Sequence, residues 1–526
     1  MMNTARWHVM AMVAAWIAVS GCGGTPPAAG PDRPTSAETA KATAAAPAPT
    51  RPTTSAMPEL VLGVLELPII DRELAMWAGF LDAVAPGLGA NLDLARLRSL
   101  AATSGFDLDA LRLDRPGWVV ILDPRRFDDP LLLVIEVADR AEVERAVAVE
   151  GDVALATRGS LAAIGSTEAL AAAAGYALES LPAGPAPAAV GFEVNVGWLQ
   201  AVTEELLESI DVTAGLSTND RAAMQMLRVV HQLRRLRVGL AVDAGTATAT
   251  LTVEPNPGSA MARWIGEQRP AAFRLATELP RSTLVAAGSI MFDQIWDDLI
   301  AWVRTLTPAT DPAALDIYRR WTQVFRGEQG LALRIVRGPV VLLAWEHGEA
   351  SAAAPLWRSW VDHTLTMDSP GAPLTHQQHR HRDVAIEVAA RANRGPATAV
   401  MAGAPLESWA QVATAVTAER LLVAIADDPV PELRMHLDRR AAAPAKPPAL
   451  PPPFADAAAR GESYLVTVDL ATLFRSTMAW LTLGSAPPAT PAGSPASIGL
   501  GFRDGAAHVR IAMPASQVRA LIDALP

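Results

Sequence analysis

Runs of alternating apolar and polar residues recur along most of the chain after residue 57. Alternation with a period of two puts the apolar side chains on one face of a strand, so these runs predict half-buried β-strands. Between them, apolar residues recur every three or four positions, the spacing of an amphipathic helix, as in the segment with Trp77 and Phe80. Strands outnumber long helices and do not alternate with them strictly. The pattern therefore predicts an α+β fold whose mainly antiparallel sheets are covered by helices.

The expected strands are separated by residues that favour tight turns. Two hairpins are the clearest, with turns at Ala244-Gly245 and Asp504-Gly505. A short helical segment follows each of them, with Trp264 in one and Leu521 in the other. Further strands are expected at residues 60–64, 118–122, 131–137, 192–196, 284–288, 331–336, 340–345 and 464–468. The mostly short connections between neighbouring strands favour antiparallel pairing.

Similar segments occur twice in the same order. Each set has an opening strand followed by a helix, a hairpin followed by a helix start, a strand that leads into a helix, and a closing hairpin. The first of these hairpins reads ALATRGSLAAIGSTEAL from Ala154 and AVTAERLLVAIADDPVPEL from Ala415, and corresponding members lie about 220 to 270 residues apart. This recurrence indicates an internal duplication, with a first α+β half at residues 58–275 and a second at residues 276–526.

The composition excludes several classes of protein. The 526 residues are 50% apolar and 19% charged and include 14 Trp, so the chain can bury a large core and is expected to fold. The length suggests about two or three domains. The formal net charge of -11 argues against a nucleic-acid partner, because such proteins need a basic face to neutralise phosphates.

The N-terminus has the features of a secretory signal. Arg6 is the only formal charge before the chain's single cysteine, Cys22, and a mostly apolar run occupies residues 9–19. This run is too short to span a bilayer well. The stretch Val19-Ser20-Gly21-Cys22 resembles the lipobox of bacterial lipoproteins, in which a small residue precedes an invariant cysteine.

The resemblance implies that residues 1–21 are a signal peptide and that Cys22 becomes the acylated first residue of the mature protein. In that family the lipid anchors the protein stably in a membrane, so the membrane is the expected partner through Cys22. Gly23 follows the cysteine, in place of the Asp that favours inner-membrane retention in enteric-type bacteria. The expected location is the cell envelope, at the outer membrane and facing the periplasm.

Residues 22–57 are rich in proline, alanine and threonine and contain no large apolar residue before Met57. Such a composition cannot bury a core, so it predicts a disordered tether with a coil-like reach of about 30 to 35 Å. Two further proline-rich segments, at residues 441–453 and 485–495, lie within the folded sequence and predict loops.

The best candidate for chemistry is the segment LTHQQHRHRDVAIEV, which contains His376, His379, His381 and Asp383. If the segment forms a strand, His379 and His381 share one face with Asp383, and two imidazoles with a carboxylate suit zinc or another divalent ion. The neighbouring glutamines and arginines favour a solvated strand or hairpin rim instead, because metal ligands need a buried shell that fixes their imidazoles. The sequence leaves both interpretations open.

Catalytic motifs are absent from the rest of the sequence, which lacks a G-x-S-x-G elbow, an H-E-x-x-H pair and a P-loop. We therefore expect no enzymatic activity and no cofactor. The body resembles uncharacterised exported bacterial proteins built from repeated units with a hairpin of the LAAIGSTEAL type, and that resemblance implies no chemistry. The leading interpretation is a membrane-anchored envelope lipoprotein that binds or scaffolds an unknown protein. The alternatives are a carrier of a lipid or other apolar ligand, and a metal-dependent enzyme that uses residues 376–383.

Overall fold

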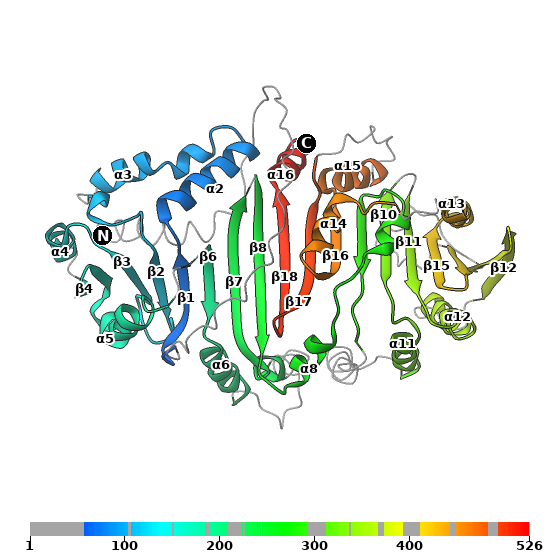
Figure 1. Ribbon diagram of the computed structural model, residues 1–526, viewed down its shortest axis with the longest axis horizontal. Coiled ribbons are helices and arrows are strands. Elements are labelled where there is room, and N and C mark those ends of the chain that lie inside the picture. The colour runs from blue at the N-terminus through cyan, green and yellow to red at the C-terminus, as the bar shows by residue number, and fades with distance from the viewer. Residues whose placement is uncertain are drawn as a thin grey trace. The chain divides into compact units, whose positions relative to one another are not determined.

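The computed structural model describes residues 57–524 of the chain with several gaps (Figure 1). The gaps fall at residues 104–106, 150–151, 185–186, 188, 209–223, 225–226, 244, 293–311, 336–337, 367–372, 393–410, 442–447 and 482–492. The chain divides into two compact units. Unit 1 contains the residues up to Leu199 together with Arg237–Ala247, and unit 2 contains Gln200–Leu236 together with Thr248–Pro526.

Unit 1 contains an antiparallel sheet with the strand order β4-β5-β3-β2-β1-β6. Its strands are β1 (Val61–Leu67), β2 (Gly117–Leu122), β3 (Leu131–Glu136), β4 (Val153–Arg158), β5 (Leu161–Ser166) and β6 (Val190–Val194). Val119 and Val120 of β2 point to opposite faces, and both are buried. Because β2 is buried on both sides, both faces of the sheet need a covering layer.

Helices supply that layer on both faces of unit 1. They are α2 (Ile70–Val84), α3 (Leu94–Thr103), α4 (Arg140–Val149) and α5 (Thr167–Gly175), with single turns η1 (Gly89–Leu92), η2 (Leu108–Ala110) and η3 (Tyr176–Ser180). On one face, Leu74 of α2 and Val143 of α4 belong to the same buried cluster as Val119. On the other face, Ala169 of α5 packs with Val120. A further helix, α6 (Val196–Glu208), runs across the division at Leu199.

Unit 2 contains a longer sheet with the strand order β8-β18-β17-β16-β9-β10-β11-β15-β14-β13-β12. Its strands are β9 (Leu284–Gly288), β10 (Gln329–Ile335), β11 (Pro339–Glu346), β12 (Leu374–His381), β13 (Val384–Arg391), β14 (Gln411–Val416), β15 (Arg420–Ala426), β16 (Glu462–Val468), β17 (Ala496–Arg503) and β18 (Ala506–Pro514). The division between the units passes through β7 (Leu233–Asp243) and β8 (Thr246–Pro255).

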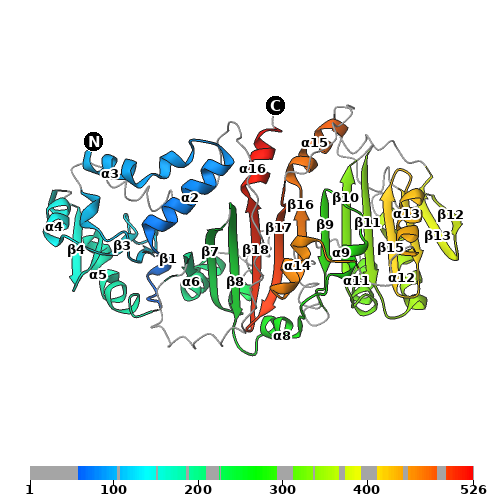
Figure 2. The same ribbon diagram turned by 45° about the horizontal axis from the view of Figure 1, so that its top comes forward.

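Helices also cover both faces of the inner strands of unit 2. They are α8 (Ala260–Glu267), α9 (Arg274–Glu278), α11 (Pro312–Val324), α12 (Ala350–Thr366), α13 (Val430–Ala441), α14 (Pro452–Ala459), α15 (Leu470–Leu481) and α16 (Ala515–Ile522). Trp357 of α12 packs with Leu421 on one face of β15, whereas Leu433 of α13 and Leu275 of α9 pack with Leu422 on the other. Figure 2 shows α9 and α14 beside the strands β9 and β16. None of the described helices is long and apolar enough to cross a membrane.

The predicted α+β class and the mainly antiparallel pairing are confirmed, and every strand expected from the alternation is present. Two details differ from expectation. Helix α14 begins at Pro452, inside the expected loop 441–453, because proline suits the first turn of a helix. The expected boundary between residues 275 and 276 falls within helix α9, and unit 2 also contains residues 200–236 and 248–275, which the sequence analysis assigns to the first half.

Candidate functional site

Cys22, the expected lipid-bearing residue, lies outside the described residues, as does the whole segment before Met57. The signal peptide, the lipid and the tether therefore stay predictions. Of the loops expected at residues 441–453 and 485–495, residues 442–447 and 485–492 also lie outside the described residues.

The histidine segment forms the first strand, β12, of the hairpin β12-β13, and its side chains divide between the two faces. His376 lies opposite Ala389, which packs in the cluster with α12, whereas His379 lies opposite Ile386, which packs in the cluster with α13. His381 follows His379 at a spacing of two, so these two share the α13 face. The prediction that His379 and His381 share a face is therefore confirmed, and His376 lies on the opposite face.

Carboxylates from neighbouring elements hold two of these imidazoles separately. On the α12 side, Nδ1 of His376 is 3.4 Å from Glu387, and Nε2 is 3.6 Å from Asp362. On the α13 side, Nε2 of His381 is 2.8 Å from Oδ1 of Asp438. Each contact joins the hairpin to a helix or to its own second strand.

Asp383 lies in the turn of the hairpin and is exposed, so it does not continue the face of β12 as the strand interpretation required. The preceding Arg382 contacts Asp438, with its Nε 2.9 Å from Oδ1. The four predicted ligands therefore do not converge on one point. Within the described ranges, no three His, Cys, Asp or Glu side chains form a group that could hold a metal ion.

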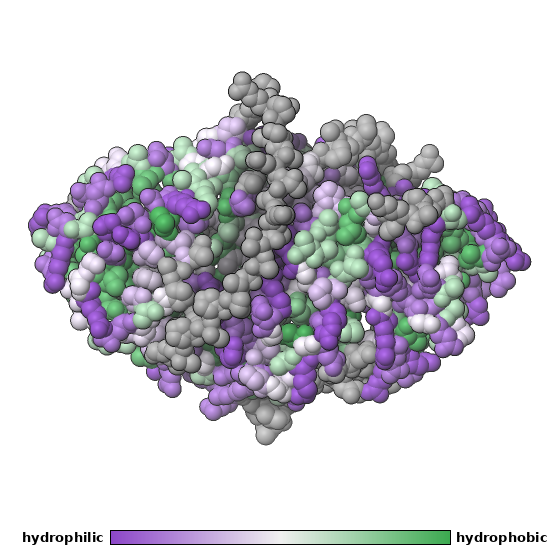
Figure 3. All heavy atoms as spheres, in the orientation of Figure 1, coloured by the Kyte–Doolittle hydropathy of each residue, from purple (hydrophilic) through white to green (hydrophobic). Residues whose placement is uncertain are grey.

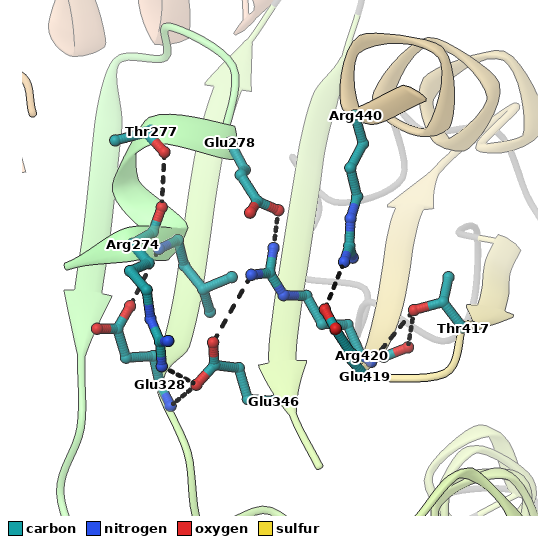
Figure 4. Close-up of polar contacts among 10 residues, drawn as sticks. Arg274, Thr277, Glu278, Glu328, Glu346, Thr417, Glu419, Arg420 and Arg440 are labelled. Atoms are coloured by element: carbon teal, nitrogen blue, oxygen red, sulfur yellow. Dashed lines mark hydrogen bonds and ion pairs between the residues drawn. The ribbon is translucent and has the colours of Figure 1, made fainter. Parts of the chain in front are cut away.

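A buried ion network, which the sequence analysis missed, lies at one end of the strands β11 and β15 in unit 2 (Figure 4). Arg420 and Glu346 are direct cross-strand partners. The Arg420 side chain is only 8% exposed, and its guanidinium contacts Glu278 of α9 and lies 3.7 Å from Glu346. Arg274 reaches Glu346 from the other end of α9, at 3.2 Å. One arginine thus bridges α9 and the end of β11.

Glu328 extends the network below α9 and is 5% exposed. Its carboxylate accepts a hydrogen bond from the N–H of Leu275 at 3.0 Å, and its own N–H donates to Glu346 at 3.0 Å. Burial raises the pKa of Glu328, while the Leu275 N–H acts in the opposite direction. A glycine stands next to it because a Cβ at Gly327 would lie 2.4 Å from the Cβ of Glu346.

His436 of α13 is 2% exposed and His347, which follows β11, is 8% exposed. Among the described residues, none of the four ring nitrogens of these two buried imidazoles has a hydrogen-bond partner. Burial and the positive charges of Arg439, Arg440 and Arg420 lower the pKa of His436 to about 4. This imidazole is therefore neutral at pH 7.

The arginines and glutamates of the ion network pair with one another, so the network stabilises contacts between α9, β11 and β15. It supplies no nucleophile with an adjacent base. No local motif identifies the network, because Glu278 and Arg420 are far apart in the sequence. The available signal is the position of the charges at strand ends: Glu346 ends the run VVLLAWE, and Arg420 begins the run RLLVAIA. Charges of this kind indicate where a buried strand ends, but they do not predict which charged residues form ion pairs with each other.

One face of the hairpin β17-β18 is apolar and half open. Ile498 and Ile511 are direct cross-strand partners, and they are 47% and 44% exposed. Leu500 and Val509, the next pair on the same face, are only partly buried. Single exposed apolar residues are ordinary on protein surfaces, whereas a pair placed directly opposite each other forms a continuous apolar patch.

Comparison with known proteins assigns no family. No protein-family model matches the chain, and no curated protein matches it. Among solved structures, crystal form IV of TP0453 matches 49% of this chain and 98% of its own, at 8% identity and a TM-score of 0.25. Crystal form I of TP0453 matches 50% of this chain at 8% identity and a TM-score of 0.24. Likenesses at this TM-score carry no argument about fold or function.

Proposed function

We propose that this chain is a lipid-anchored protein of the cell envelope, with a non-enzymatic binding role and a duplicated α+β body. The observation that carries the anchor is the single cysteine of the chain, which stands at position 22 directly after an apolar run and the small residues Ser20 and Gly21. A lone cysteine has no intramolecular disulfide to form, and in this context its thiol is suited to acylation.

Replacing Cys22 with Ser should release the mature protein from the membrane fraction, with the membrane-to-soluble ratio falling by about tenfold or more, because the acyl chains supply the anchoring energy. Fractionation by density gradient and the mass of the N-terminal peptide measure this result. Moving the cysteine to residue 36 in the Cys22→Ser variant should not restore anchoring. Gly23→Asp tests the outer-membrane location, since it should shift the protein to inner-membrane fractions. Full membrane retention of Cys22→Ser would refute the anchor.

The duplication is supported by matching strand pairings in the two units. In unit 1, β1 pairs with β2 and β6, β2 with β3, β3 with β5, and β5 with β4. In unit 2, β9 pairs with β10 and β16, β10 with β11, β11 with β15, and β15 with β14. If the hairpin β12-β13 is set aside as an insertion of the second half, β9, β10, β11, β14, β15 and β16 correspond in order to β1–β6. The five antiparallel pairings are then the same, and independent folds would have little reason to share them.

The helices support the duplication in the same way. Helix α4 follows β3, as α12 follows the corresponding β11, and each covers one face of its sheet. Helix α5 follows β5, as α13 follows the corresponding β15, and each covers the other face. A capping residue also recurs at the start of α6 and α15. The N–H of Asn195 donates to the carbonyl of Leu62 at 2.9 Å, and the N–H of Asp469 donates to that of Thr283 at 2.9 Å. The side chain of each also accepts an N–H three residues later, at 3.3 and 3.0 Å.

A second candidate function, an apolar-ligand carrier, is favoured by the open face of β17-β18. Ile498, Leu500, Val509 and Ile511 offer a hydrocarbon chain dispersion contacts and no hydrogen bonds, so we infer that an acyl chain is the ligand this face fits. A polar partner would lose hydration there without compensation.

Changing Ile498 and Ile511 together to Thr should weaken binding of a fluorescent fatty acid by about tenfold, because two paired aliphatic side chains would be lost from the contact. Stability should change by less than about 1 kcal/mol, since both side chains are already half exposed. Fluorescence titration and urea unfolding measure the two quantities. Met435→Thr is the matched control, because Met435 is a separate, similarly exposed apolar side chain of unit 2. Unchanged probe binding in the Ile498/Ile511 variant would exclude the carrier role for this face.

A further inference from the structure

Strand β12 ends the sheet of unit 2 on one side. It pairs with β13 in an unbroken register from Leu374 opposite Arg391 to His381 opposite Val384, and among the described residues no strand pairs with its other edge. Its eight residues contain no proline and no bulge. The backbone N–H and C=O groups on that edge are therefore arranged to accept one more strand.

Apart from Leu374, the side chains of β12 are polar, and none of them is a carboxylate. Five of the eight residues are exposed, and hydrophilic residues cover the right-hand end of Figure 3, where Figure 1 places β12. Carboxylates of other elements already hold His376 and His381. The side chains of His379 and Arg380 make no hydrogen bond or ion pair with any residue that the structure describes. Being consecutive, they project to opposite faces of the strand.

This charge pattern discriminates between possible strands. A second copy of β12 would bring the same side chains and no carboxylate, so it offers Arg380 no opposite charge. A strand with carboxylates would meet the charge of Arg380 on one face and the imidazole of His379, a hydrogen-bond donor, on the other. Charges on an edge often serve only to prevent aggregation, yet such charges repel only segments of like sign. Because no side chain of β12 is a carboxylate and the Arg380 side chain has no partner among the described residues, an acidic segment is the occupant that this edge fits.

We propose that β12 is a docking edge for an extended acidic segment of a partner protein. The segment adds a strand beside β12, and two consecutive carboxylates of that strand pair with His379 on one face and Arg380 on the other. Backbone hydrogen bonds supply general affinity, and these two pairs supply selectivity. The proposal depends neither on the lipid at Cys22 nor on the open face of β17-β18.

The test uses the full chain and a fluorescent peptide, Val-Thr-Val-Glu-Glu-Val-Thr-Val. It should bind about tenfold or more tightly than the same peptide with two lysines in place of the glutamates, because opposite charge is favoured and like charge is penalised. N-methylation of the central amides should abolish binding, since it removes the donors that strand addition requires. In hydrogen exchange, the bound peptide should protect amides of residues 374–381.

Charge reversal gives the decisive comparison. The double variant His379→Glu with Arg380→Glu should reverse the preference, binding the lysine peptide more tightly than the glutamate peptide. Arg503→Glu, an exposed arginine on another hairpin of unit 2, should leave the preference unchanged. Equal binding of both peptides, no binding at millimolar concentration, or protection elsewhere than β12 would overturn the proposal. So would sedimentation showing self-association that the double variant abolishes, because the occupant would then be a second copy.

Discussion

Replacing Arg420 with Met should lower the free energy of unfolding by about 3 kcal/mol. The substitution keeps a long apolar stem but removes the guanidinium that lies between Glu278 and Glu346. Both carboxylates are largely buried, at 24% and 18% exposed, so removal of their cation leaves negative charge in a poorly solvated place. The loss should exceed that of a surface ion pair, because water cannot replace the guanidinium as effectively there.

Denaturant unfolding of the full chain measures this loss in the transition that includes unit 2. Arg274→Met is the matched control, because the Arg274 side chain is 65% exposed and its contact with Glu346 should contribute less than about 1 kcal/mol. Removing Glu278 as well, in the double variant Arg420→Met with Glu278→Met, should recover about 1 kcal/mol or more, since one uncompensated carboxylate is gone. If the double variant were no more stable than Arg420→Met alone, lost packing rather than unpaired charge would explain the effect.

The elements of this fold could be predicted because the signals that define them are local. The alternation around Ile498 and Ile511, with the turn at Asp504-Gly505, specified a hairpin without reference to any distant residue. The pattern did not say that this pair would stay half exposed, because exposure depends on which helices pack over the strands.

The ion network illustrates what local patterns leave undetermined. Glu346 and Arg420 meet only because β11 pairs with β15, and Glu278 joins them only because α9 packs over those strands. Charged residues at strand ends all have similar local sequence patterns. Their ion-pair partners therefore depend on the topology of the sheet and cannot be predicted from sequence spacing.

The histidine segment was predicted only in part from its local pattern. The period of two correctly placed His379 and His381 on one face, and by the same rule it placed His376 on the other. The same rule placed Asp383 with them, which is wrong, because β12 ends at His381 and Asp383 lies in the turn. The predicted metal site needed this carboxylate beside the two imidazoles, and the turn directs it elsewhere.

Acidification should destabilise the protein through His436. Its pKa is about 4 in the folded state, against 6.5 for an unperturbed imidazole, because burial and three nearby arginines disfavour the charged form. Between these values the unfolded chain binds a proton that the folded chain does not. Stability is therefore fully present above about pH 6.5 and falls as the pH decreases toward 4. The total loss should be about 3 kcal/mol, because each pH unit between the two pKa values contributes about 1.4 kcal/mol.

The His436→Leu variant isolates this effect. Glu328 acts in the opposite sense, since its raised pKa makes the folded state gain stability as the pH falls, but it is present in both proteins. Urea unfolding at several values between pH 7.5 and 4 should show wild type losing about 3 kcal/mol relative to the variant. A flat difference between wild type and His436→Leu would mean that the protonated imidazole finds a partner in the folded state, and that α13 rearranges to provide it.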